Sequence, residues 1–270
     1  MRGRSWGFEA ASAGSIRFDD VELSSPRPVA LRRRIQMVFQ DPSTALNPVM
    51  SVERTLRELL GLRGTICRSA QDQRCEELME LVDLPGDVLK RRPAELSGGQ
   101  RQRVSIARAL TMEPDLLIAD ESVAALDVSV QASILNLFQD LRERLGLTLI
   151  LISHDLSVIR QTCDDVAVMY LGEVVERRLT GDLIADPLHP YSKALIAAAP
   201  RFGTRKTPGL SMLPGEPPSP MHKREGCAFA SRCPEAIDIC RSVAPALTSL
   251  RTDTSVACHV ASSADTSRSL

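Results

Sequence analysis

The stretch Leu96-Ser97-Gly98-Gly99-Gln100 is followed sixteen residues later by Leu116-Leu117-Ile118-Ala119-Asp120-Glu121. Ser97 is a favourable helix N-cap, and the two glycines let backbone N–H groups approach an anion closely. The helix expected over residues 100–111 turns its positive dipole end toward that anion. The second stretch reads as a buried strand that ends in two carboxylates. Together they predict an anion site and a strand-tip acid pair within one domain.

This pairing suits a protein that hydrolyses nucleotides. At the end of a strand, Asp120 can hold Mg²⁺, and Glu121 can orient or deprotonate a water molecule. The glycine turn alone also fits an ordinary helix start, but the acid pair at this distance favours the nucleotide interpretation. The arrangement resembles the signature and Walker B motifs of the ATP-binding subunits of ABC transporters. The resemblance assigns Ser97, Gly98, Gly99 and Gln100 to nucleotide binding.

The resemblance implies an α/β, P-loop NTPase-like ABC ATPase domain with a parallel sheet core and an α-helical insert over about residues 51–110. A phosphate-binding Walker A loop reads G-x-x-x-x-G-K-[ST]. None of the four lysines (Lys90, Lys193, Lys206 and Lys223) follows a glycine. Residues 14–20 resemble the family strand just after the P-loop helix. The domain is therefore expected to be truncated at its N-terminus, through a misplaced start, a frameshift or a degenerate subunit.

Three further motifs appear in the family's order. Val38-Phe39-Gln40-Asp41-Pro42 resembles the Q-loop, whose glutamine reaches Mg²⁺ or the attacking water. Ala124-Ala125-Leu126-Asp127 resembles the D-loop, which meets the opposite subunit, and Ser122 stands where the family commonly has proline. His154, after an apolar strand, resembles the H-loop histidine that bonds a γ-phosphate. Taken singly, the glutamine reads as a turn residue and the histidine as the cap of the next helix.

The C-terminal part carries Cys227, Cys233, Cys240 and Cys258 without any C-x₂-C spacing. Their Pro-rich setting, with His189-Pro190-Tyr191 upstream, resembles the oligopeptide and dipeptide (peptide/nickel) importer ATPases. In that group four such cysteines can ligate a [4Fe–4S] cluster. Four thiolates suit iron–sulfur or Zn²⁺, and the alternative is four reduced thiols that pack a small core.

Composition narrows the class of protein. The net charge is −1, so there is no electrostatic case for nucleic-acid binding. No apolar run reaches the ~18–20 residues of a membrane span, and no secretory signal is recognisable. Seven cysteines in such a chain favour free thiols or a metal over disulfides. We expect a soluble chain whose link to a membrane runs through a partner.

The coarse pattern predicts strands at 35–39, 115–119, 147–152, 165–170 and 173–178 and helices at 51–60, 71–82, 100–111, 129–144 and 155–162. Because the strands at 115–119, 147–152 and 165–170 are continuous apolar runs, we expect them in one parallel sheet covered on both faces. The expected domains are an ATPase domain at 1–199, a linker at 200–225, a Cys-rich motif at 226–260 and a disordered tail at 261–270.

The favoured function is an ATP-hydrolysing subunit that energises oligopeptide or dipeptide import, with ATP and Mg²⁺ as cofactors. The resemblance makes Glu121, His154 and Gln40 catalytic, places Asp120 and Gln40 on Mg²⁺, and adds Asp120 and Asp127 to the nucleotide-binding residues. The implied partners are a second ATPase subunit in a homo- or heterodimer, transmembrane permease subunits and, indirectly, a periplasmic or extracellular peptide-binding protein. The chain itself is expected at the cytoplasmic face of the membrane. The alternative is a non-catalytic subunit that donates its signature loop to an intact partner, since activity of this chain alone is doubtful without Walker A.

Overall fold

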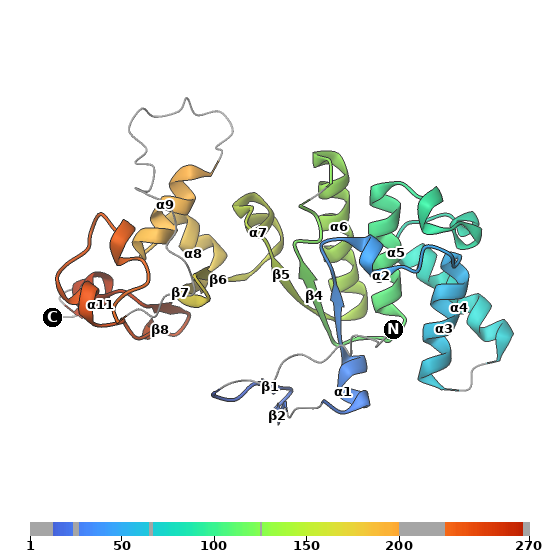
Figure 1. The fold of residues 1–270 in the computed structure, drawn as a ribbon, viewed down its shortest axis with the longest axis horizontal. Helices are drawn as coiled ribbons and strands as arrows, with labels where there is room; N and C mark the ends of the chain where they lie inside the picture. Colours follow the sequence, from blue (N-terminus) through green and yellow to red (C-terminus); the bar gives the residue numbers. More distant parts are fainter. Residues whose placement is uncertain (1–12, 24–26, 65–66, 125, 200–224, 267–270) are drawn as a thin grey trace. The chain divides into compact units, whose positions relative to one another are not determined.

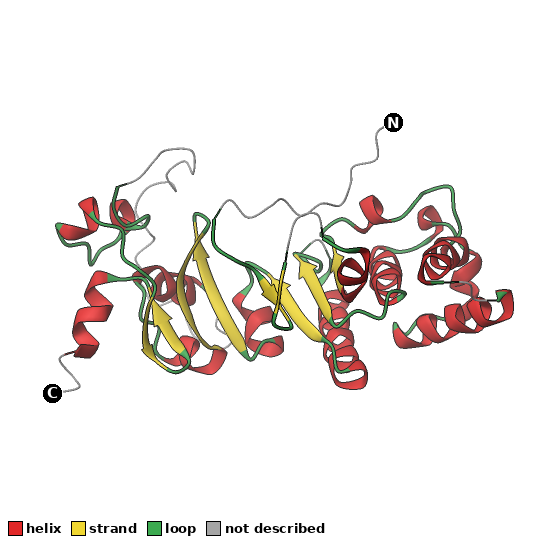
Figure 2. Ribbon diagram, turned by 90° about the horizontal axis from the view of Figure 1, so that it is seen from below, coloured by secondary structure: helices red, strands yellow, loops and turns green. Residues whose placement is uncertain are grey.

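The computed structural model describes residues 13–23, 27–64, 67–124, 126–199 and 225–266. They form two compact units that divide between Ile152 and Ser153. The first unit combines a parallel sheet with a helical insert, and the second is built on an antiparallel sheet (Figures 1 and 2). Within the described ranges, no helix is both long and apolar enough to cross a bilayer.

The elements of the first unit lie close to their predicted positions. In chain order they are β1 (Arg17–Phe18), β2 (Val21–Glu22), α1 (Val29–Arg34), β3 (Ile35–Val38), α2 (Pro42–Ala45), α3 (Val52–Arg63), α4 (Arg68–Leu81), η1 (Gly86–Lys90), η2 (Pro93–Glu95), α5 (Gly98–Leu110), β4 (Leu116–Asp120), α6 (Val128–Leu145) and β5 (Thr148–Ile152). The stretch at 14–20, expected as a single strand, instead enters the hairpin of β1 and β2. Asp19 and Asp20 both have positive φ there, the backbone of a tight hairpin turn.

The parallel sheet runs in the order β3-β4-β5. Val38, Leu117 and Ala119 share its inner face and are fully buried on the side of α5 and α6. The opposite face carries Ile150 and Ile152, which are 46% and 47% exposed. The expectation that both faces are covered is therefore wrong for the described part of the chain. An apolar run indicates that a strand is suited to burial, but it does not predict which helix or strand packs on each of its faces.

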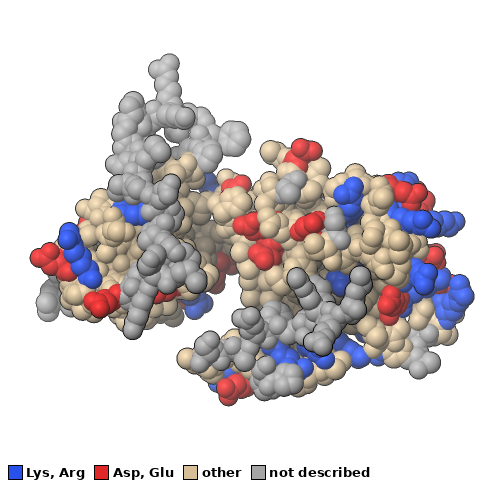
Figure 3. All heavy atoms as spheres, viewed as in Figure 1, with Lys and Arg blue, Asp and Glu red and all other residues tan. Residues whose placement is uncertain are grey.

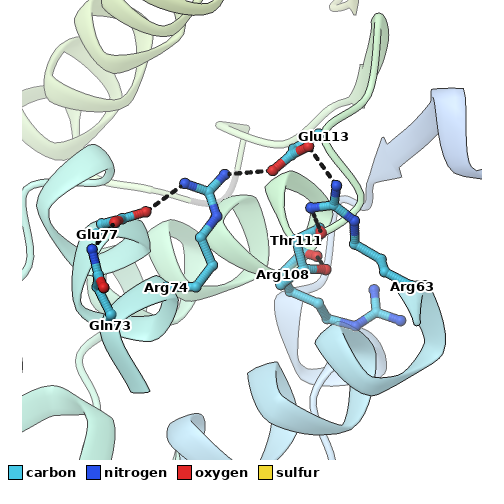
Figure 4. A network of polar contacts seen from close by, with 7 residues as sticks. All are labelled: Arg63, Gln73, Arg74, Glu77, Arg108, Thr111 and Glu113. Atoms are coloured by element: carbon cyan, nitrogen blue, oxygen red, sulfur yellow. Dashed lines mark hydrogen bonds and ion pairs between the residues drawn. The ribbon is translucent and has the colours of Figure 1, made fainter. Parts of the chain in front are cut away.

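The insert is held to the sheet by polar contacts as well as by its apolar core. Ser51 caps α3 as predicted, accepting the N–H of Arg54. Glu113, in the turn between α5 and β4, accepts hydrogen bonds from Arg63 on α3 and Arg74 on α4 (Figure 4). Because one carboxylate binds both helices, α3 and α4 are tied to the turn that leads into β4.

The second unit starts after β5. Its elements are α7 (Leu156–Thr162), β6 (Asp165–Tyr170), β7 (Glu173–Leu179), α8 (Thr180–Ala185), α9 (Pro190–Ala198), η3 (Ala230–Arg232), α10 (Ile239–Ser242), β8 (Thr248–Arg251), β9 (Thr254–Val256) and α11 (His259–Thr266). The strand at 165–170, expected in the parallel sheet, pairs antiparallel with β7 instead. Leu171 and Gly172 both have positive φ, the geometry of a two-residue hairpin, which turns the chain back on itself.

The Cys-rich segment is part of this sheet rather than a separate motif. β9 pairs with β7 between Glu176 and Val256, which gives the order β6-β7-β9-β8. The expected boundary at residue 199 therefore does not separate two folded bodies. Residues 261–266, expected to be disordered, continue α11, because the short Ala/Ser run follows a helical turn in which Ser262 N–H bonds Cys258 O. The expected linker lies almost wholly outside the described residues.

The His-Pro-Tyr run has a structural role in the second unit. The buried Glu176 carboxylate on β7 accepts the backbone N–H groups of Leu188 and His189, both at 2.9 Å. His189 Nδ1 then caps α9 by accepting the Tyr191 N–H at 3.0 Å. The Tyr191 ring packs against Tyr170 and Phe229, with centroids 4.7 and 5.5 Å apart. The run thus joins β7, α9 and the Cys-rich segment.

Replacing Glu176 by alanine should destabilise the protein by about 3 kcal/mol, because two buried N–H donors lose a charged acceptor and Arg178 loses its nearby carboxylate. Urea unfolding monitored by circular dichroism measures this. Glu173→Ala, an exposed change on the same strand, is the control and should stay within about 0.5 kcal/mol of wild type. Equal effects of the two changes would contradict the capping role.

Burial lowers the pKa of His189 to about 4, whereas an unfolded histidine titrates near 6.5. Between these values the unfolded chain binds more protons, so this contribution to stability is present above pH 6.5 and is lost as the pH falls toward 4. His189→Asn keeps a side-chain acceptor at the cap but does not titrate. Stability curves from pH 7 to 4 should fall less steeply for the variant, and parallel curves would refute this origin.

Candidate functional site

The Q-loop glutamine and the Walker B glutamate meet at the carboxyl end of the parallel sheet. Because β3 and β4 run in parallel register, residues just beyond their ends lie side by side. Gln40 Nε2 donates a hydrogen bond to Glu121 Oε2 at 2.9 Å. Asp120 is the last residue of β4, next to Glu121. The structure thus brings together Gln40, Asp120 and Glu121, as the sequence predicted.

The backbone at Glu121 is unusual for its residue type. Its φ is +42°, in the left-handed region that residues with a Cβ seldom adopt. The conformation is held by a bond from Glu121 N–H to Ile152 O on β5, at 3.0 Å, and by the turn bond from Ala124 N–H to Glu121 O. Strained residues of this kind concentrate at functional sites, which favours a chemical role for this carboxylate.

The signature residues form a capping box. Ser97 Oγ accepts the Gln100 N–H at 3.2 Å, and Gln100 Oε1 accepts the Ser97 N–H at 3.0 Å. The Ser97 hydroxyl proton stays available to donate, because the cap uses only an oxygen lone pair. The N–H groups of Gly98 and Gly99 lie in the first turn, where a helix has no internal acceptor for them. The helix start can therefore offer several donors to one anion.

The D-loop aspartate and the H-loop histidine are both exposed at helix starts. Asp127 is the N-cap residue of α6 but makes no side-chain cap bond. His154 belongs to the second unit, two residues after β5 ends. Asp155, whose carboxylate accepts the Ser157 N–H at 2.8 Å, caps α7 in its place. The alternative that His154 caps the following helix is therefore wrong.

The four C-terminal cysteines lie near one another in the second unit. Cys227 N–H bonds Cys240 O at 2.8 Å, and Cys240 and Cys258 are buried. Burial raises the pKa of the Cys227 thiol and raises that of Cys233 to about 11. Within the described ranges, no three His, Cys, Asp or Glu side chains are grouped to hold a metal ion. The raised pKa values favour the protonated thiol at Cys227 and Cys233 in this arrangement.

The absence of a group of three metal-binding side chains among the described residues is compatible with a magnesium site at the strand tip. Mg²⁺ commonly binds one or two carboxylates and completes its shell with phosphate oxygens and water, so a protein cage of three ligands is not required. Asp120 and Gln40 fit this pattern.

On the face shown in Figure 3, acidic and basic side chains are interspersed over the helical insert rather than gathered in one basic patch.

Two kinds of functional contact were missed by reasoning from the sequence. Glu176 accepts the backbone N–H of His189, the N-cap residue of α9. Val130 on α6 lies against Gly99 of the signature. Both contacts join residues that are distant in the chain. An isolated glutamate within a strand and a valine on a helix give no local signal of such a partner.

Comparison with known proteins matches both parts of the chain. Residues 6–124 match the ABC transporter family, and residues 175–240 match the oligopeptide/dipeptide transporter C-terminal region. A Brucella abortus protein named as a peptide import ATP-binding protein is 50% identical over 230 residues, covering 85% of this chain and 68% of that protein. One from Brucella ovis is 46% identical, covering 89% of this chain and 77% of its own.

Solved structures agree with this result. The dimeric ATP-binding cassette MJ0796, bound to ADP and phosphate, is 28% identical with a TM-score of 0.55, covering 63% of this chain and 74% of that one. The protein cbiO1 of Clostridium perfringens, part of the ABC transporter complex cbiONQ, is 30% identical with a TM-score of 0.59, covering 65% and 69%. The signature, the strand-tip acid pair and these matches together show that the chain belongs to the ATP-binding subunits of ABC transporters, in the group of peptide import ATP-binding proteins.

Proposed function

We propose that this chain is an ATPase subunit that powers the import of oligopeptides or dipeptides through a membrane transporter. The observation that carries the proposal is the contact between Gln40 and Glu121 at the tip of β3 and β4, beside Asp120. The matches to the ABC transporter family and to the oligopeptide/dipeptide C-terminal region support the substrate class. The family's cofactors are ATP and Mg²⁺.

Each strand-tip residue has a distinct role in this proposal. Glu121 orients the attacking water and accepts its proton, and Gln40 holds the carboxylate in place by its 2.9 Å bond. Asp120 and Gln40 would hold Mg²⁺, which neutralises charge on the phosphate oxygens when it is bound with ATP. His154 would donate a hydrogen bond from a ring N–H to the γ-phosphate.

The signature residues act on a nucleotide held mainly by another subunit. Ser97 donates its hydroxyl proton, and Gly98 and Gly99 present their first-turn N–H groups to the γ-phosphate. Gln100 keeps Ser97 in position through the capping box. Asp127 contacts the second ATPase subunit. The permease subunits and, through them, an extracellular peptide-binding protein complete the assembly at the cytoplasmic face of the membrane.

A second function follows from one feature of the printed sequence. None of its lysines follows a glycine, so these 270 residues contain no Walker A motif. A subunit that carries no such loop would leave Gln40, Asp120 and Glu121 no nucleotide of its own to act on. The signature residues would still complete the site of an intact partner subunit. In this case the chain is a non-catalytic subunit that donates its signature loop.

Two substitutions in the assembled transporter separate these functions. Glu121→Gln keeps the side-chain shape but removes the base, so it should lower ATP turnover at this chain's own site by roughly 10²-fold or more. Ser97→Asp keeps a good helix cap but places a negative charge against the γ-phosphate, so it should lower turnover at the partner's site. Steady-state phosphate release measures both, and Ser97→Thr, which keeps hydroxyl and cap, is the control.

A catalytic subunit loses activity with both substitutions, whereas a signature donor loses it only with Ser97→Asp. Full activity of both variants would contradict both the catalytic and the signature-donor function. Thermal unfolding of each purified variant should match wild type within a few degrees, which separates lost chemistry from lost folding.

We further propose that the four C-terminal cysteines bind one metal centre, either [4Fe–4S] or Zn²⁺. The support is their proximity: Cys227 N–H bonds Cys240 O, and Cys258 and Cys227 lie close enough to Cys233 to add to the effect of burial, which is the main cause of its raised pKa. The thiols would have to rotate toward one another and lose their protons. A short segment with few large apolar residues gains most from such a staple.

Anaerobic purification followed by metal analysis tests this proposal. A brown protein that absorbs near 400 nm and contains about four iron atoms per chain would indicate the cluster, and one zinc per chain would indicate a structural zinc. Cys240→Ser, which keeps the size of the side chain, should abolish binding. Protein that contains neither metal would leave the cysteines with the packing role alone.

A further inference from the structure

The second glycine of the signature has no room for a side chain. A Cβ atom built on Gly99 would lie 2.7 Å from Val130 Cγ1 on α6 and 3.9 Å from Val130 Cβ and Cγ2. Carbon atoms that are not bonded do not approach so closely, so the helices fit only because residue 99 is glycine. Valine in a helix keeps essentially one side-chain rotamer, and it cannot swing away at low cost. The backbone of α5 therefore rests directly on Val130.

Two neighbouring contacts continue this interface. A Cβ on Gly98 would lie 3.7 Å from Leu126 Cδ2, an ordinary contact distance, so the Leu126 side chain of the D-loop lies beside the signature. One helical turn further along, Arg103 Nη2 on α5 donates to Ser133 Oγ on α6 at 2.6 Å. Arg103 Nη1 donates to Asp83 Oδ2 beyond α4 at 3.0 Å. Successive turns of α5 are thus matched to successive turns of α6.

We propose that Val130 is a positioning residue that sets the register of the signature helix α5 on the D-loop helix α6. The signature loop and the D-loop of one chain then present a single rigid surface, because neither helix start can slide without breaking the Gly99–Val130 and Arg103–Ser133 contacts. Gly99 is required for this packing in addition to any approach of its N–H to phosphate. The functional part of this inference rests on the function proposed above.

The position of the donors explains why register matters. The hydroxyl of Ser97 and the first-turn N–H groups must reach the same phosphate, and a shift of about 1 Å is enough to weaken such a set. The neighbouring Val128 is 84% exposed on the same helix and close to Asp127. It lies beside the contact in the chain but has no part in it, which makes it a matched control for Val130.

Variants of the full chain, including the Val130→Ala and Val128→Ala single changes, test the contact by double-mutant cycles. Gly99→Ala should lower Tm by roughly 3–8 °C, because it overpacks the interface. Gly99→Ala combined with Val130→Ala should recover most of that loss, since removing the two methyl groups makes space for the new one. Gly99→Ala combined with Val128→Ala should recover none of it.

The same variants are then assayed in the assembled transporter at 20 °C, well below their unfolding transitions. We expect Gly99→Ala to raise the apparent KM for ATP several-fold, because a displaced signature loop binds the phosphate poorly. Addition of Val130→Ala should return KM to within about twofold of the Val130→Ala single variant. A loss of folded protein alone would lower kcat and leave KM unchanged.

Recovery of both Tm and KM in the Gly99/Val130 double variant supports the proposal. Recovery equal to that given by Val128→Ala, or recovery of Tm with KM still raised, overturns it. The Tm measurements need no ATPase activity. An assembly that lacks ATPase activity with the wild-type chain would therefore contradict the proposed function while the test of the contact by Tm still stands.

Discussion

The parallel pairing of β3, β4 and β5 is the constraint on which the rest of the site depends. In parallel strands the carboxyl ends meet at one edge, so Gln40 comes together with Asp120 and Glu121 although it lies 80 and 81 residues before them in the chain. The bond from Glu121 N–H to Ile152 O then fixes the glutamate in a left-handed conformation. The acid pair is thus positioned by backbone hydrogen bonds rather than by packing of flexible side chains.

A second set of contacts links the helical insert to the sheet and the signature helix α5 to α6. Arg63 and Arg74 bind Glu113 and tie the insert to the turn before β4. Gly99 and Val130 join the start of α5 to the start of α6. The signature, the D-loop and the strand-tip carboxylates therefore belong to one packed unit. A protein that couples nucleotide chemistry to movement of a partner needs such a unit, because a loose loop would absorb the motion.

Apart from the strand-tip residues that the family resemblance brought together, the features predictable from the sequence were local ones. Ser97 and Ser51 were expected as caps and are caps, since capping depends on residues three positions away. The strand at 165–170 was placed in the wrong sheet, because an apolar run reports burial and not its pairing partner. The thiols at 227, 233, 240 and 258 were expected to converge, and Cys227 does bond the backbone of Cys240, but no three such side chains among the described residues are grouped to hold a metal ion. Long-range contacts such as those of Val130 and Glu176 have no local sequence pattern that predicts them.

A photoreactive ATP analogue with its reactive group on the γ-phosphate gives the most direct test of how this chain handles nucleotide. After irradiation of the assembled transporter, mass spectrometry of the digested chain identifies the labelled peptide. Labelling at residues 97–100, competed away by ATP, is the expected result, because the Ser97 hydroxyl and the first-turn N–H groups face that phosphate. Labelling of the partner subunit with none on this segment would contradict the role of the signature loop.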